Sequence, residues 1–158
     1  ISGGAVVIGN IAALLFVTVP GQEKYDGSFV SLKTKENTKV FTVSEVPFRL
    51  EFRNGGNVSI NPYGMLVIKN LFGSEVEKKI IDPWFVLPDS TRTRDISLLV
   101  PNGFGYYKAL AQINRGYENI VDEKEISFFI IPQFMIGISV LVLAFFVYVL
   151  GKKMLYRK

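Results

Sequence analysis

Two pairs of carboxylates are the residues of this chain whose spacing could support acid–base chemistry. Glu75 and Glu77 lie two positions apart, as do Glu123 and Glu125, so each pair would share one face of a β-strand. Lysine follows the first pair directly and separates the members of the second, a pattern typical of a solvated strand face. The sequence therefore predicts no catalytic residue, and the chain is interpreted as a non-enzyme.

Histidine and cysteine are both absent from the chain. Without them the commonest general base, the commonest metal ligand and any disulfide are excluded. Aspartates do fall at predicted strand ends, where a calcium ion could be held by oxygen ligands, but they follow no calcium-loop spacing and read as turn residues. These aspartates are Asp82, Asp89, Asp95 and Asp122. We predict no metal site, no cofactor and no small-molecule substrate.

A long segment near the C-terminus carries no charged side chain. No charged residue occurs from Ile126 to Gly151, and the core of the segment, Ile130 to Leu150, is almost wholly aliphatic and aromatic. About 20 such residues in a helix, at about 1.5 Å each, span a hydrocarbon layer of about 30 Å. The pattern predicts one transmembrane helix over residues 130–151.

The net charge of the chain is concentrated behind that segment. The net charge is +4, and four cations follow Gly151, so residues 1–151 are neutral overall. A basic cluster after an apolar span marks the cytoplasmic side and attracts anionic lipid headgroups. The sequence thus predicts a single-pass cell-membrane protein with its bulk outside, a cytoplasmic tail over 152–158, membrane lipid as a partner and no nucleic acid. The cations of the tail are Lys152, Lys153, Arg157 and Lys158.

Residues 21–129 show the pattern of short strands separated by turns. In the stretch PFRLEFRN, apolar Phe48, Leu50 and Phe52 alternate with charged residues, which indicates a strand with one buried and one wet face. Further strands are predicted at 28–35, 65–70, 75–81, 93–100, 104–114 and from 124 onward. The fold class predicted is all-β, an immunoglobulin-like antiparallel sandwich followed by a single C-terminal transmembrane helix.

The turn chemistry of this region carries a resemblance. The stretch EFRNGGNVSINPYGMLVIKNLFG, together with Val86 to Ser90 ahead of Arg92, resembles the C-terminal immunoglobulin-like, membrane-anchored domain of a group of uncharacterised bacterial surface proteins. These are similar in layout to WxL-interacting cell-surface proteins. The resemblance covers about a third of the chain and is carried by turn residues, so it speaks for fold more than function. It implies attachment or scaffolding at the cell envelope and supplies no catalytic residue. The matching positions in the stretch are Phe52, Asn54, Gly56, Asn57, Asn61, Pro62, Gly64, Asn70 and Gly73.

The first residues of the chain allow two interpretations. Ile1 to Val19 is uncharged and could be a first transmembrane helix. Its glycines, Asn10 and the ending FVTVPG favour terminal strand sequence of an upstream β-domain over residues 1–20.

Alternating strand directions assign each loop to one end of the sandwich. The loops Leu71–Ser74 and Pro101–Phe104 would lie beside the membrane, with Phe72 and Phe104 at headgroup level. Three longer loops, at 54–63, 82–90 and 115–122, would lie at the opposite end. These loops carry large aromatic side chains of the kind that bind partners, namely Tyr63, Trp84, Phe85 and Tyr117.

The function predicted from the sequence is that of a non-enzymatic, membrane-anchored surface protein. It would act as a stalk or docking module for another extracytoplasmic protein or an envelope component. Two alternatives stay open: an accessory subunit of a larger membrane protein complex, and the anchor of an ectoenzyme whose catalytic domain lies upstream. The identity of the partner and the oligomeric state are not encoded in these patterns.

Overall fold

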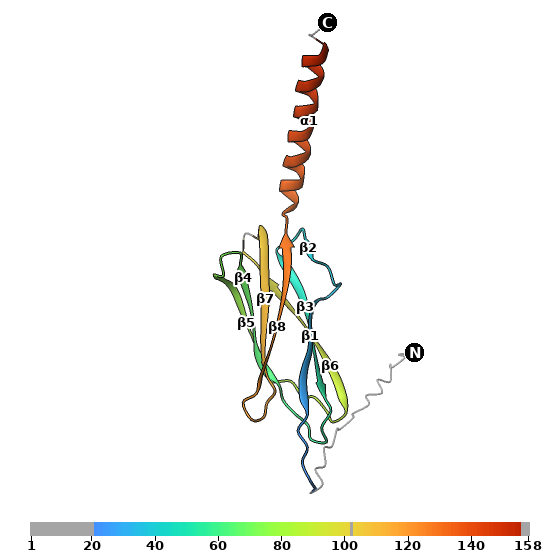
Figure 1. Ribbon diagram of the computed structural model, residues 1–158, viewed down its shortest axis with the longest axis vertical. Coiled ribbons are helices and arrows are strands. Elements are labelled where there is room, and N and C mark those ends of the chain that lie inside the picture. Colours follow the sequence, from blue (N-terminus) through green and yellow to red (C-terminus); the bar gives the residue numbers. More distant parts are fainter. Residues whose placement is uncertain (1–20, 102, 156–158) are drawn as a thin grey trace, which may run out of the picture.

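The computed structural model describes residues 21–101 and 103–155 (Figure 1). Residues 1–20, for which terminal strand sequence is predicted, lie outside the described residues. So do Arg157 and Lys158 of the predicted tail. The described residues form eight strands and one helix. The strands are β1 (Gly27–Thr34), β2 (Val40–Phe41), β3 (Glu45–Asn54), β4 (Tyr63–Asn70), β5 (Glu75–Ile81), β6 (Ser90–Leu99), β7 (Gly105–Asn114) and β8 (Val121–Ile130), and the helix is α1 (Gln133–Leu155).

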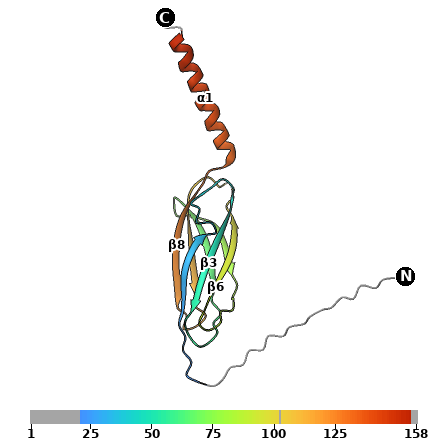
Figure 2. The ribbon, with the colours of Figure 1, turned by 90° about the vertical axis from the view of Figure 1, so that its right-hand side faces the viewer.

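The strands form two sheets that pack face to face (Figures 1 and 2). One sheet has three strands in the order β1-β3-β6, and the other has five in the order β2-β8-β7-β4-β5. Neighbouring strands are antiparallel except for β2, which pairs in parallel with the end of β8. This two-sheet arrangement confirms the predicted immunoglobulin-like β-sandwich. The parallel β2–β8 pair was not expected from the sequence.

The core lies between the two sheets and follows from strand alternation. Phe48, Leu50 and Phe52 of β3 are fully buried, as the pattern of that strand predicts. Phe128 of β8 is fully buried in this core, where its ring stacks on Tyr107 at 5.8 Å and meets Phe48 edge-on at 5.7 Å. Such aromatic contacts add to the free energy of burying the rings themselves.

The register of the strands fixes which loops share an end. Gly105 of β7 pairs with Ile130 of β8, and Asn70 of β4 pairs with Tyr107, so the β4–β5 and β6–β7 loops lie beside α1. We call this the near end. The β3–β4, β5–β6 and β7–β8 loops lie at the opposite, far end, where residues 21–26 lead into β1 (Figure 2).

The predicted transmembrane helix is not found. Ile126 to Ile130, the first part of the uncharged segment, belongs to β8, because these residues pair with β7 and their last members also pair with β2. The helix begins only at Gln133, after Pro132. Of the part of the chain that the structure describes, no helix has the length and apolarity that crossing a bilayer requires. The predictions of a single-pass membrane protein and of its cell-membrane location are therefore corrected.

Candidate interaction site at the near end

Large apolar side chains gather, exposed, at the near end of the sandwich. They come from loops and strand ends of both sheets and from the first turn of α1. A concentration of exposed apolar side chains is typical of an interaction site. The near-end apolar set consists of Val40, Val43, Leu71, Phe72, Leu99, Phe104, Phe129 and Phe134.

The β4–β5 turn shows why two members of this set point outward. Asn70 accepts hydrogen bonds through Oδ1 from the backbone N–H groups of Phe72 and Ser74, both at 3.0 Å. Gly73 adopts a positive φ of 81°, which closes the turn. Because the turn satisfies its own polar groups locally, Leu71 and Phe72 are left outside, and Phe72 is 89% exposed.

The β6–β7 loop presents Phe104 in a similar way. The hydroxyl of Tyr107 accepts a hydrogen bond from the Phe104 N–H and lies 3.1 Å from its carbonyl oxygen, to which it can also donate. This holds the backbone of Phe104 while its ring stays exposed. Phe129, next along the sheet, lies edge-on to Tyr106 at 5.8 Å. The structure thus brings the predicted residues Phe72 and Phe104 to the same end as α1.

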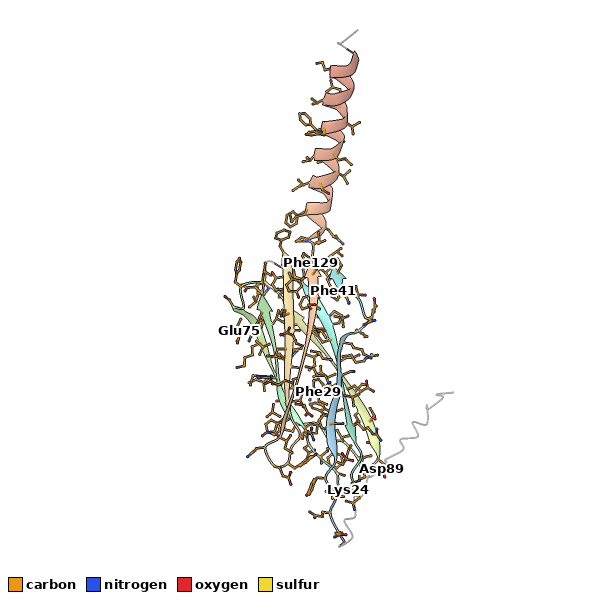
Figure 3. All side chains as sticks on the ribbon, viewed as in Figure 1. Lys24, Phe29, Phe41, Glu75, Asp89 and Phe129 are labelled. Atoms are coloured by element: carbon orange, nitrogen blue, oxygen red, sulfur yellow. The ribbon has the colours of Figure 1, made fainter. Side chains whose placement is uncertain are left out.

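The helix α1 projects from the near end with apolar side chains on all its sides (Figure 3). From Ile138 onward the large apolar side chains that the structure describes are 44–71% exposed, while Met135 in the first turn is half-buried. A Cβ built on Gly137 would meet no atom within 4 Å, so the backbone there is open to close approach. Lys152, predicted to flank the apolar segment, is exposed in the last turns of the helix. Lys153 also lies within α1.

A shallow hollow beside β2 extends the near-end site onto the three-stranded sheet. It has a volume of about 440 Å³ and mixes apolar side chains with two carboxylates. Its lining residues are Glu36, Phe41, Val43, Glu45, Pro47 and Ser97.

At the far end, the four aromatic residues predicted to bind partners do not form one exposed surface. Trp84 packs against the core, with its ring edge-on to Phe52 at 6.0 Å and beneath the Arg94 guanidinium at 5.5 Å. Its Nε1 is buried and has no hydrogen-bond partner in the described part of the chain. Tyr63 is 42% exposed, and Phe85 is partly buried in the β5–β6 loop.

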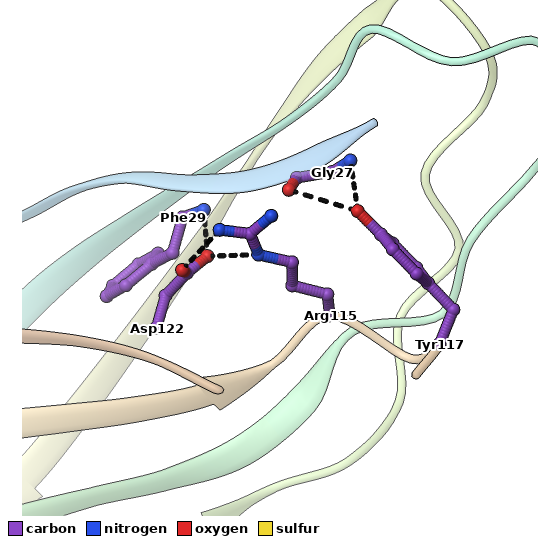
Figure 4. A network of polar contacts seen from close by, with 5 residues as sticks. All are labelled: Gly27, Phe29, Arg115, Tyr117 and Asp122. Atoms are coloured by element: carbon purple, nitrogen blue, oxygen red, sulfur yellow. Dashed lines mark hydrogen bonds and ion pairs between the residues drawn. The ribbon is translucent and has the colours of Figure 1, made fainter. Parts of the chain in front are cut away.

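Tyr117, the fourth of these residues, belongs to a polar network that ties β1 to β8 (Figure 4). Its hydroxyl accepts a hydrogen bond of 2.7 Å from the Gly27 N–H. Beside it, Asp122 accepts one of 2.9 Å from the Phe29 N–H and two from the Arg115 guanidinium, at 3.0 and 2.7 Å. The Asp122 side chain is 20% exposed, so this is a partly buried, charge-assisted network.

The network shifts the pKa of its charged members. Burial alone raises the pKa of the Asp122 carboxyl, but the hydrogen bonds from Arg115 and the Phe29 N–H outweigh it and hold that pKa below its usual value. The same ion pair raises the pKa of Arg115. Asp122 is therefore charged throughout the neutral range and holds β1 in place there.

A second far-end contact was missed by reasoning from the sequence. Asn57 fixes the segment that enters β1: its Oδ1 accepts from the Lys24 N–H at 2.7 Å and its Nδ2 donates to the Gln22 carbonyl at 2.8 Å. Its own N–H donates to the Lys24 carbonyl. The motif Asn-Gly-Gly-Asn signalled a turn, but the partner of Asn57 lies more than thirty residues earlier in the chain and leaves no local trace.

Comparisons with known proteins show the fold and leave the function open. No family model and no curated protein matches this chain. Among solved structures, the C-terminal domain of wzt is similar with a TM-score of 0.51 and 13% identity, over 70% of this chain and 79% of that one. The β-glucosidase EmGH1 from Erythrobacter marinus gives a TM-score of 0.49 and 11% identity, over 68% of this chain and 16% of its own length. The CARDB domain of the PF1109 protein from Pyrococcus furiosus gives 0.48 and 13%, over 68% and 89%. At such identities the similarity is one of fold alone.

Proposed function

We propose that this chain is a non-enzymatic docking module, an accessory subunit whose α1 packs among apolar helices of a larger protein complex. One observation carries the proposal: α1 exposes apolar side chains on all its sides and stands clear of the sandwich (Figures 2 and 3). A helix that is apolar all round is stable when it is surrounded by other apolar surfaces.

The free energies favour a partner that encloses the helix. Burying one large apolar side chain contributes about 1.5–3 kcal/mol, while association of two proteins costs about 4–15 kcal/mol. A flat surface would cover a few side chains of α1 and barely offset that cost. Several partner helices around α1 would bury most of the exposed side chains and leave a clear surplus.

The near-end apolar set extends this contact beyond the helix. Three exposed rings lie at the near end, from which α1 begins, those of Phe72, Phe104 and Phe129. They would contact the partner next to the helices that surround α1. Gly137, near the start of α1, would admit a partner backbone at close range. The sandwich is then held at a fixed distance and orientation on the complex.

Isolation of the full chain from its native source in mild detergent tests the proposal. We expect a partner in fixed stoichiometry that is lost when Leu143 and Phe146 are both replaced by Gln. Thermal unfolding of the sandwich should stay unchanged in that variant, because neither side chain contacts the core. Replacing Val30 and Ile80, which are exposed on the sandwich away from the near end, by Gln gives the matched control and should retain the partner.

Two results would overturn the proposal. One is a chain that runs as a lone monomer in mild detergent. The other is efficient incorporation of the purified chain into protein-free phosphatidylcholine vesicles through the same two side chains, which would mean that lipid, rather than a protein, covers α1.

A further inference from the structure

The chain enters and leaves the sandwich at opposite ends. Residues 21–26 lead into β1 at the far end, and β8 leads out through α1 at the near end (Figures 1 and 2). A pull between these two segments therefore acts along the length of the strands. Such a pull displaces β1 and β2 toward the far end and β8 toward the near end.

Hydrogen bonds join β1 and β2 to the β7–β8 turn and β8 at both ends of the sandwich. At the far end, Tyr117 bonds Gly27 and Asp122 bonds Phe29, as described above. At the near end, the Phe129 N–H donates to the Lys39 carbonyl at 2.7 Å, and the Ile131 N–H donates to the Phe41 carbonyl at 2.8 Å. We call this set of four links, from β1 and β2 to β8 and the turn before it, the terminal seam.

From this geometry we infer that the chain has a mechanical function: it carries tension between its two ends through the terminal seam. Strands that run in the same direction and are pulled oppositely along their length load all their cross-links at once. Strands pulled apart sideways lose their cross-links one after another. Forced unfolding is governed by the unfolding rate, and simultaneous loading of all links raises the barrier that sets this rate.

The remaining contacts of the terminal strands act in the same sense. β1 is paired with β3 from Gly27 to Thr34, and β8 with β7 along its whole length, so both ladders are also loaded lengthwise. The charge-assisted bonds of Asp122 are stronger than neutral ones and lie at the far end, where tension enters. The ring of Phe41 packs edge-on against Phe128 at 5.9 Å and so ties β2 to the core beside the near-end links.

This function goes beyond docking and does not depend on which protein covers α1. A role in carrying tension explains why Tyr117 of the β7–β8 turn and Asp122 of β8 bind the backbone of β1. A turn that only connects two strands needs no such contact.

Single-molecule pulling on the full chain in mild detergent tests the inference. The chain has no cysteine, so handles can be attached at chosen pairs of sites. Handles at E23C and Q133C pull along the terminal seam. Handles at S74C and Q133C both lie at the near end and peel β5 and β8 from the five-stranded sheet. We expect a several-fold higher unfolding force along the seam, and equal forces in the two geometries would overturn the inference.

A pair of variants at one position then tests the near-end links. Phe129→Pro removes the N–H that donates to Lys39, at a position where β8 gives no N–H to β7. Phe129→Ala also removes the ring but keeps the N–H. Along the seam, Phe129→Pro should unfold at lower force than Phe129→Ala, with no difference in the peeling geometry. If the two variants unfold at the same force along the seam, the inference fails, and if Phe129→Pro does not fold, the comparison of the two geometries in the unaltered chain still decides.

Discussion

The two ends of the sandwich differ in how their loops bond their polar groups and where they place their apolar side chains. At the far end, side chains such as Asn57 and Asp122 bind backbone groups of the entering chain, and the aromatic rings of Trp84 and Tyr117 pack inward. At the near end, the turns satisfy their polar groups locally and leave Phe72 and other apolar side chains in solvent. The far end thus binds its own entering chain, and the near end leaves apolar side chains exposed for the contact proposed above.

The largest difference between the ends is expected at two glycines. A Cβ at Gly56 would overlap the carbonyl oxygen of Lys24 and lie 2.9 Å from the backbone N of Asp26. At Gly73 of the near end a Cβ would meet nothing, and its positive φ is the remaining cost. Gly56→Ala should lower the free energy of unfolding by about 3 kcal/mol through overpacking, and Gly73→Ala by about 1 kcal/mol. Urea unfolding measures both, and equal losses would contradict the closer packing of the entering chain at the far end.

The second prediction concerns the ion pair of the far end. Asp122→Ala leaves Arg115 and the Phe29 N–H without their acceptor and should lower the free energy of unfolding by about 2 kcal/mol. Asp95→Ala, which breaks the more exposed pair with Arg49, is the control and should cost less.

The pH dependence of this contribution has a definite sign. The pKa of Asp122 is lower in the folded chain than its ordinary value, so its stabilisation is present above about pH 4 and is lost as the pH falls through the folded pKa. The difference in urea midpoint between the unaltered chain and Asp122→Ala should therefore shrink as the pH falls below about 4. A difference that stays constant with pH would show that packing, and not charge, holds β1 there.

The smallest effect compares two tyrosines that use their hydroxyls alike. The Tyr117 hydroxyl is within hydrogen-bond distance of both the N–H and the carbonyl of Gly27, ninety positions away. The Tyr107 hydroxyl makes the same two contacts with Phe104, three positions away. Tyr117→Phe should lower the free energy of unfolding by about 1 kcal/mol, and Tyr107→Phe by less, because its loop is solvated and local. Hydrogen exchange should show faster exchange at Gly27 in the first variant and at Phe104 in the second. Loss of Gly27 protection in both would mean that the ends are not independent.

Much of the fold could be predicted because it depends on local patterns. Alternation along Phe48, Leu50 and Phe52 identified a strand with one buried face, and that face is the core. Strand spacing also placed the β4–β5 and β6–β7 loops, with Phe72 and Phe104, at the end from which the C-terminal segment leaves. These features follow from periods of two residues and from turn chemistry, which a sequence displays directly.

The candidate sites were predictable only in part. The aromatic residues of the far-end loops were expected to bind a partner, but their types do not reveal whether a ring faces solvent or the core. Trp84 packs on Phe52 because the β5–β6 loop folds back over β3. The backbone N–H of Trp84 donates a hydrogen bond to the Pro62 carbonyl and holds the loop there. Asp122 read as an ordinary turn residue, since Phe29, its partner, lies 93 positions earlier.

By itself the sequence determined the alternating strands, the neutral balance of residues 1–151, and the uncharged character of Ile126 to Gly151. The tertiary structure decided how that uncharged stretch is divided. Ile126 to Ile130 became strand because β7 offers backbone partners along all of them and β2 offers partners to the last two, and α1 begins only at Gln133. Composition fixes how apolar a segment is, whereas its choice between strand and helix depends on hydrogen-bond partners that come from distant parts of the chain.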